Sequence, residues 1–309
     1  MDKVTTVLQC IVPIFVTVLL GVMARRKQLL TQEQIRGLQQ FVMKFGLPCV
    51  LFNSCLSADI STETVGTFAL VAPIMILAAV WAFRFGRKKF PYHNLPMLFC
   101  AQETGMLGIP LFMILFGSAQ AYRMGILDMA QMPAAFPTIA ILSASAGANP
   151  SKKEIVNNVV RSPLLIMSVI GLLLNLTGIA AWLDGIGIGG IITESTGFLA
   201  QPVSAIMIFC VGYNFSMAKG HRRAIFQVSA LHLAWTVAFG LVIQLILLLI
   251  PNVDTLTRWA VLMYSTLPAS YLAPSLGRNE EDFALASGVC SILTVVSLAV
   301  FCVMAVIVA

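Results

Sequence analysis

Charged residues are scarce in this chain of 309 residues. Asp, Glu, Lys and Arg make up 10% of the sequence, whereas hydrophobic residues make up 59%. Soluble globular domains carry about 25% charged residues, so this composition excludes an ordinary soluble protein and is typical of a polytopic membrane protein. Apolar stretches of about twenty residues, the length that spans a bilayer, recur along nearly the whole sequence. They leave no room for a separate soluble domain.

Several chemical signatures are also lacking. The number of cysteines, seven, is odd, they lie in or beside apolar segments, and no metal-ligand spacing occurs, so we predict no disulfide framework, metal site or cofactor. There is no Walker A loop, which argues against ATP hydrolysis. Asp128 and His232 lack the sequence context of an intramembrane enzyme, and we interpret His232 as a packing residue. The net charge of +6 comes from short loops and does not indicate nucleic-acid binding.

Ten apolar segments are present, and each is long enough to be a transmembrane helix. Five would fall in each half of the chain. The ten predicted spans are about Thr5–Ala24, Ile35–Leu56, Thr64–Phe85, Leu95–Phe116, Tyr122–Ala144, Ser162–Ile179, Thr196–Met217, Val228–Ile250, Leu256–Leu276 and Phe283–Val308. We expect the second span to be interrupted at Gly46-Leu47-Pro48.

The basic residues are distributed unevenly between the two sides of these spans. Of the 19 lysines and arginines, Lys3, Arg123 and Arg258 fall on one side, and Lys44 lies within a span. The remaining fifteen follow spans 1, 3, 5, 7 and 9. Because cytoplasmic loops carry an excess of Lys and Arg, this asymmetry predicts a cell inner membrane protein with both termini on the non-cytoplasmic side.

The fourth span contains groups that are unfavourable in a membrane helix. Gln102 and Glu103 are followed by Gly105, Gly108 and Pro110. Proline lacks an N–H and clashes with the carbonyl one turn back, so we predict that this helix breaks at Pro110, in mid-membrane. Unwound backbone is tolerated there only where protein or a water-filled cavity covers it. The stretch is therefore predicted to line a buried site.

The second half of the chain repeats features of the first. Pro13 and Gly21 in span one have the same spacing as Pro163 and Gly171 in span six. Span nine carries prolines at positions 268 and 274, and span four carries Pro110 at its predicted break. Paired interruptions in two halves are the best sequence pointer to a transporter binding site. We therefore predict two inverted five-helix repeats, residues 1–154 and 155–309, with helix breaks at Pro110, Pro268 and Pro274.

Two motifs resemble those of the auxin efflux carrier (PIN-like) family, which includes malonate and malate carriers. "ETGMLGIPL" in span four is similar to the family's "NTGFLGIPL", and "ILDMAQ" in span five to a D-x-x-N pattern. The resemblance implies an all-α ten-helix fold in which broken helices 4 and 9 cross at the substrate site. It also implies elevator movement of spans 3–5 and 8–10 against a scaffold of spans 1, 2, 6 and 7. Glu103 and Gln131 replace the family's two asparagines.

Glu103 is the most informative of these residues, because a carboxylate at mid-bilayer is costly and normally marks a pathway. Three interpretations remain open: a proton carrier, a contact for a cationic group of the substrate, or a protonated structural group. Asp128 lies three residues from Gln131, on one helix face. For Asp128, a packing role and a role in substrate binding or proton coupling are equally open.

We therefore expect a secondary transporter of a small organic anion, with half-helix N–H groups receiving the carboxylate. Amino acids or other zwitterions, sodium coupling in place of proton coupling, and a ligand receptor that does not transport remain alternatives, and a homodimer stays open. The predicted substrate-binding residues are Gln102, Glu103, Thr104, Gly105, Gln131, Thr266, Ala269, Ser270, Tyr271, Asn53 and Tyr213.

Overall fold

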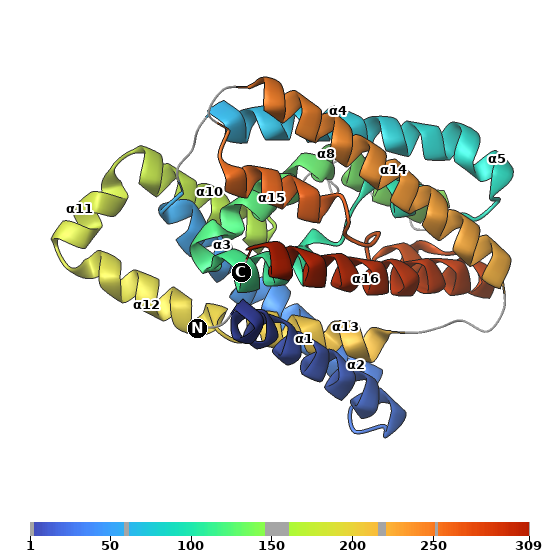
Figure 1. The fold of residues 1–309 in the computed structure, drawn as a ribbon, viewed down its shortest axis with the longest axis horizontal. Helices are drawn as coiled ribbons and strands as arrows, with labels where there is room; N and C mark the ends of the chain where they lie inside the picture. The colour runs from blue at the N-terminus through green and yellow to red at the C-terminus, as the bar shows by residue number, and fades with distance from the viewer. Residues whose placement is uncertain (1–2, 59–61, 146–160, 216–220, 251–252, 309) are drawn as a thin grey trace.

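The computed structural model describes residues 3–58, 62–145, 161–215, 221–250 and 253–308 (Figure 1). Helical segments make up nearly all of these ranges. Their bounds are α1 Lys3–Arg26, α2 Gln32–Phe41, η1 Val42–Gly46, α3 Leu47–Leu56, α4 Thr62–Trp81, η2 Ala82–Gly86, α5 Arg87–Lys89, α6 Met97–Cys100, η3 Thr104–Gly108, α7 Ile109–Phe116, η4 Ser118–Gln120, α8 Ala121–Ser145, α10 Pro163–Leu176, α11 Ile179–Gly185, α12 Ile188–Ala200, α13 Val203–Asn214, α14 Arg222–Leu249, α15 Thr255–Tyr264, η5 Ala273–Leu276 and α16 Glu280–Val308.

The prediction of an all-α membrane protein is confirmed for these residues. Within them, extended pairing is limited to one isolated bridge, and five helical stretches are long and apolar enough to cross a membrane. A sixth candidate, α10 with α11, is bent by 77° after Leu176. The arrangement as ten spans stays a prediction. The stretches that qualify are Val65–Lys89, Ser118–Ser143, Ile188–Asn214, Arg222–Leu249 and Glu280–Val308.

One set of helices is built on two close helix pairs, α1 with α13 and α3 with α10. In each pair a glycine allows the approach. A Cβ on Gly21 of α1 would lie 2.2 Å from the carbonyl oxygen of Phe209, and a Cβ on Gly171 of α10 would lie 2.6 Å from that of Phe52. Small residues let helix backbones approach closely in membranes, and here any side chain would separate them. This set, with α2, α11 and α12, occupies the lower and left parts of Figure 1.

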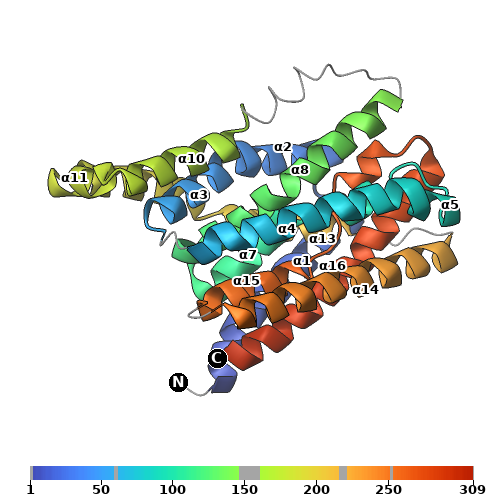
Figure 2. The ribbon, with the colours of Figure 1, turned by 90° about the horizontal axis from the view of Figure 1, so that it is seen from above.

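The other set contains α4, α6, α7, α8, α14, α15 and α16. Helix α4 packs along α8, and α14 packs against α16 and α15. Figure 2 shows α4, α14 and α16 running side by side in this set. The large buried side chains Phe99, Phe112, Tyr264 and Phe301 lie here, each 2% exposed or less. The hydrophobic core of the set therefore surrounds the two interrupted segments described below.

The interruption predicted in the second span is absent. Residues 42–46 form a π turn, η1, and α3 continues directly from it, with Pro48 among its first residues. The N–H of Leu47 bonds to O of Val42, five residues back, so the π turn changes the hydrogen-bond pattern directly before the proline. In the seventh predicted span, Gln201 and Pro202 lie between α12 and α13, and the two helices together form the stretch Ile188–Asn214.

Candidate functional site

The fourth predicted span is interrupted, but not at Pro110. Helix α6 ends at Cys100, and Ala101 is extended, with φ −148° and ψ 136°. The chain becomes helical again at Thr104, through the π turn η3 into α7. Pro110 is one of the first residues of α7 and directly follows the π turn, in which the N–H of Ile109 bonds to O of Thr104, five residues back. The prediction of a break at Pro110 was therefore wrong, and the break lies at residues 101–103.

The ninth predicted span is interrupted over a longer stretch. Helix α15 ends at Tyr264, and residues 265–272 are not helical before the short 3₁₀ turn η5. Pro268 lies within this stretch, and Pro274 is among the first residues of η5. Proline cannot donate a backbone hydrogen bond, so both positions fit where the helical ladder is already absent.

The two interrupted segments meet. Gln102 and Ala269 form an antiparallel bridge, in which the N–H of Glu103 donates to O of Pro268 at 2.8 Å. The N–H of Ser270 donates to O of Ala101 at 3.0 Å. We call residues 101–103 and 268–270 the crossover. Its extended backbone, unsatisfied within either helix, is thus paired between two parts of the chain that are far apart in sequence.

Gln131 of α8 holds the first crossover segment. Its Oε1 accepts from the N–H of Gln102 at 2.7 Å and from the hydroxyl of Tyr264 at 2.9 Å. Its Nε2 donates to O of Gln102 at 3.1 Å and to the hydroxyl of Thr104 at 3.2 Å. A third contact of Nε2, at 2.9 Å, reaches Oδ1 of Asp128. One buried amide therefore connects α8, α15 and the crossover.

Glu103 lies at the centre of the crossover and is 8% exposed. Its Oε1 accepts from the N–H of Met106, at the start of η3, at 3.2 Å. Its Oε2 accepts from the N–H of Tyr271, in the other interrupted segment, at 2.6 Å. Each oxygen of the carboxylate therefore binds one of the two interrupted segments, and the side chain joins the two halves of the chain. Carboxylates suit such backbone N–H groups because these carry partial positive charge.

A second carboxylate lies close by. Asp128 is 6% exposed and shares the amide of Gln131 with Thr104. Within the described ranges, neither Asp128 nor Glu103 forms an ion pair with a cationic side chain. The interior of this set of helices thus holds two carboxyl groups compensated only by neutral hydrogen-bond donors. Buried charges are normally paired, and this exception marks the region as a candidate functional site.

Two residues outside the predicted site, His232 and Cys290, contact the crossover, and Tyr264 contacts Gln131, which holds it. The amide nitrogen of Gln102, oriented to donate, lies 3.2 Å from Nε2 of His232, whose Nδ1 lies 2.7 Å from O of Leu98. These contacts hold the imidazole as the neutral Nδ1–H tautomer and agree with a packing role for His232. Tyr264 contacts Gln131, and Cys290 Sγ lies 3.6 Å from O of Ala269. Their apolar sequence context concealed these contacts, which only the tertiary fold creates.

The structure does not bring every predicted site residue to the crossover. Asn53 bonds to α12, accepting from the hydroxyl of Thr196 at 2.6 Å. The hydroxyl of Tyr213 donates to O of Leu30 at 2.5 Å, at the far end of α13. Both therefore lie within the set of helices that carries α1 and α13, where they join neighbouring elements.

Most of the other predicted residues lie in or next to the crossover. Gly105 follows it in η3, where an added Cβ would lie 3.7 Å from Leu47. The hydroxyl of Thr266 donates to O of Met263 at 2.9 Å, and its carbonyl accepts from the hydroxyl of Ser297. Ser270 is 7% exposed, and its hydroxyl accepts from the N–H of residue 272.

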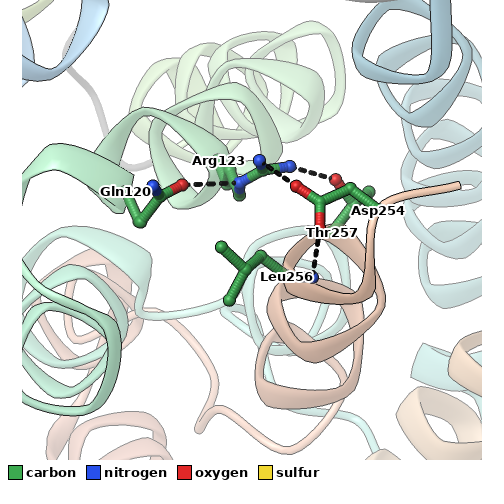
Figure 3. Close-up of polar contacts among 5 residues, drawn as sticks. All are labelled: Gln120, Arg123, Asp254, Leu256 and Thr257. Carbon is green, nitrogen blue, oxygen red and sulfur yellow. Dashed lines mark hydrogen bonds and ion pairs between the residues drawn. The ribbon is translucent and has the colours of Figure 1, made fainter. Parts of the chain in front are cut away.

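A separate polar cluster joins the start of α8 to the start of α15 (Figure 3). Arg123 donates to Thr257 and to the carboxylate of Asp254, and its Nε donates to Gln120 at 3.0 Å. The other oxygen of Asp254 caps α15 by accepting from the N–H of Leu256 at 3.0 Å. The guanidinium group of Arg123 thus donates hydrogen bonds to three partners, and the cluster fixes α8 against α15.

The chain was compared with known proteins. Residues 6–148 match the model of a family described as "Membrane transport protein". The matched range contains the first crossover segment, Glu103, Asp128 and Gln131. No curated protein matches the chain. The protein is accordingly a multi-pass membrane protein whose residues 6–148 match the membrane transport protein family, the auxin efflux carrier or PIN-like family that its motifs resemble.

Proposed function

We propose that the protein is a secondary transporter that carries a small organic anion across the cell inner membrane and binds it at the crossover. The observation that carries this proposal is the meeting of two interrupted helices around buried polar groups. Non-helical backbone at membrane depth is tolerated only where it is buried or lines a cavity, and in transporters it commonly forms the binding site. The expected partner is a small solute.

The donors at the crossover favour an anion. The N–H groups of Met106 and Tyr271 both point to one carboxylate, that of Glu103. The N–H of Met106 lies near the start of a helical segment, and such groups are ready-made for carboxylate and phosphate groups. Thr104 and Ser270 add hydroxyl groups close to the same place. This chemistry suits a mono- or dicarboxylate or an auxin-like acid.

Equivalent contacts in the two halves support the proposed inverted repeats, 1–154 and 155–309. Gly21 of α1 lies against α13, and Gly171 of α10 lies against α3. Four residues after each glycine, a side chain caps carbonyl groups at the end of the same partner helix. Arg25 donates to O of Phe215 at 2.9 Å, and Asn175 donates to O of Ala58 at 2.7 Å. Span one against span seven thus matches span six against span two.

A second pair of contacts follows the same symmetry. At the start of α8, Arg123 binds Asp254, which precedes α15. At the start of α16, Asp282 accepts from the N–H of His93, which precedes α6, at 2.9 Å. Each contact links the fifth helix of one half to the entrance of the fourth helix of the other half. These paired contacts support the inverted repeat independently of the positions of the prolines.

An elevator mechanism fits the two sets of helices. Spans 1, 2, 6 and 7 correspond to the set built on α1, α3, α10 and α13, which we propose as the scaffold. Spans 3–5 and 8–10 correspond to the set that carries the crossover, which we propose as the moving transport domain. The positive-inside asymmetry of the loops supports termini on the non-cytoplasmic side.

We further propose that Glu103 couples transport to protons, with Asp128 as the second acid. An anion at Met106 and Tyr271 would be repelled by a charged Glu103 carboxylate. Binding therefore favours the protonated side chain, and release favours the charged one. Substrate and proton would then move together.

An amino acid or another zwitterion is the second candidate. The observation that favours it is the absence, among the described residues, of a cation beside Glu103 and Asp128. A substrate ammonium group, or a sodium ion, would supply that charge. An ammonium-bearing substrate would lose binding in Glu103→Gln, whereas an anion would not.

The test is uptake by the purified protein in liposomes. Labelled monocarboxylates, dicarboxylates and amino acids are offered with and without an inward-directed proton gradient. We expect an organic acid to accumulate in the wild type with the gradient, and Glu103→Gln to transport the same acid without responding to it. Glu194→Gln removes an exposed carboxylate on α12 and is the matched control. Uptake that ignores the gradient in both wild type and Glu103→Gln contradicts proton coupling.

A further inference from the structure

Glu103 does more than face the crossover, because its side chain fastens the crossover together. One carboxylate oxygen takes the N–H of Met106 and the other takes the N–H of Tyr271. The two donors lie 165 positions apart in the sequence and belong to different interrupted segments. The carboxylate is therefore a clasp between the two segments, in addition to the two backbone bonds of the bridge itself.

The clasp uses the donors that the proposed function assigns to the substrate. A backbone N–H has one hydrogen, so it makes one strong bond at a time. With Oε2 at 2.6 Å from the N–H of Tyr271 and Oε1 at 3.2 Å from that of Met106, no second carboxylate reaches both groups. Glu103 is 8% exposed, so the space around it is already filled.

We propose, on the basis of the proposed function, that Glu103 is the specificity-determining residue of the crossover and acts as a tethered occupant of the substrate's carboxylate position. A substrate carboxylate enters by exchange with the Glu103 side chain. When the side chain leaves, the clasp between Met106 and Tyr271 opens, and the incoming carboxylate closes it again. Occupation by substrate or by Glu103 thereby keeps the clasp closed, in addition to the two backbone bonds of the bridge, and the clasp opens only during exchange.

Asp128 provides the internal contrast. It is a carboxylate of similar burial in the same region. Its oxygen, however, accepts from the side-chain amide of Gln131 and not from backbone N–H groups of two segments. A cavity left by removing Asp128 would lack the paired donors. The proposal therefore predicts different responses to a free carboxylate in the two positions.

The experiment is chemical rescue of folding in detergent. Glu103→Ala removes the carboxylate and leaves the N–H groups of Met106 and Tyr271 facing a cavity. Sodium formate and sodium acetate are titrated against sodium chloride at equal ionic strength, and the unfolding temperature is measured. We expect a saturable rise in Glu103→Ala, about 2–4 °C at ten times the dissociation constant. Wild type, Glu103→Gln, whose side chain fills the cavity, and Asp128→Ala should give no such rise.

A rise of equal size in wild type and Glu103→Ala, or no rise in Glu103→Ala, overturns the proposal. If Glu103→Ala does not fold, Glu103→Ser creates a similar cavity and takes its place. The readout is the rise of the unfolding temperature with formate concentration. It shows whether the two N–H groups bind a free carboxylate, and not merely whether Glu103 is needed for stability. This readout is also independent of transport. Rescue without organic-anion uptake in liposomes would refute the proposed function but not the role of Glu103 as the clasp. Uptake without rescue would refute the role of Glu103 but not the proposed function.

Discussion

Replacement of Gln131 by leucine tests the architecture of the crossover most directly. Leucine has a similar volume but neither accepts nor donates hydrogen bonds. The N–H and O of Gln102 lose their side-chain partner, and the hydroxyl of Tyr264 loses its acceptor. All three residues are buried, with 3% exposure or less. Water cannot replace the lost bonds unless the crossover opens.

The magnitude follows from these three groups. An unsatisfied buried polar group costs about 1–3 kcal/mol, but hydrogen bonds inside membrane proteins average about 0.6 kcal/mol and reach about 1.7 kcal/mol. With these three groups affected, and with Thr104 and Asp128 each losing a donor as well, we expect a loss of about 2–4 kcal/mol in the free energy of unfolding. This corresponds to a fall of roughly 5–10 °C in the unfolding temperature. Transport should be lost as well, because the first crossover segment is no longer held.

The assay is thermal unfolding in detergent, followed by uptake in liposomes. Gln40→Leu makes the same chemical change at an exposed position of α2 and should change the unfolding temperature little. Gln131→Glu retains an acceptor for Gln102 but loses the donor to Thr104 and faces Asp128, so we expect it to lie between wild type and Gln131→Leu at neutral pH. Equal unfolding temperatures for Gln131→Leu and Gln40→Leu would refute the role of Gln131 as the holder of the crossover.

Three further predictions concern the rest of the fold. Gly21→Ala forces α1 away from α13 and should lower the free energy of unfolding by about 1–3 kcal/mol, measured by thermal unfolding. Gly37→Ala, with open space around its Cβ, should not destabilise the protein. Equal effects of the two substitutions would contradict the close approach of α1 and α13. Burial, and then the nearby guanidinium groups, lower the pKa of His93 from its ordinary 6.5. The unfolded state therefore binds the proton more readily, and stability should fall as pH drops below about 6.5. If the stability of His93→Gln had the same pH dependence, His93 would not be its cause. Arg123→Met should cost about 1 kcal/mol, since Asp254 is 42% exposed, and a wild-type stability independent of salt would speak against a contribution of the pair.

Much of the architecture could be predicted from particular residues. The apolar runs gave an all-helical membrane protein, and Gln102, Glu103 and Gly105 marked the stretch that is interrupted. The spacing of Pro13 and Gly21, repeated at Pro163 and Gly171, pointed to helices that make equivalent contacts. These predictions succeed because hydrophobicity and backbone propensity act within a few residues of one another.

Other predictions failed where the surroundings decide. Pro110 was expected to break its helix, but it lies in the first residues of α7, directly after a π turn. The break forms instead at residues 101–103, where Ala101 pairs with Ser270 and Glu103 with Pro268. Asn53 and Tyr213 were expected near the substrate, but Asn53 bonds to Thr196 of α12 and Tyr213 bonds to Leu30, between α1 and α2. A polar residue in an apolar run shows that a partner exists, not which one.

The sequence by itself therefore determined the membrane environment, the helical class and the presence of unfavourable polar groups in span four, since these depend on the local cost of placing each residue in lipid. Only the tertiary structure decided that Glu103 contacts Tyr271 and that Gln131 holds Gln102, because those partners lie far along the chain. Hydrogen bonds are directional and short, and the packing of the whole set of helices brings their atoms within 3 Å or so of one another.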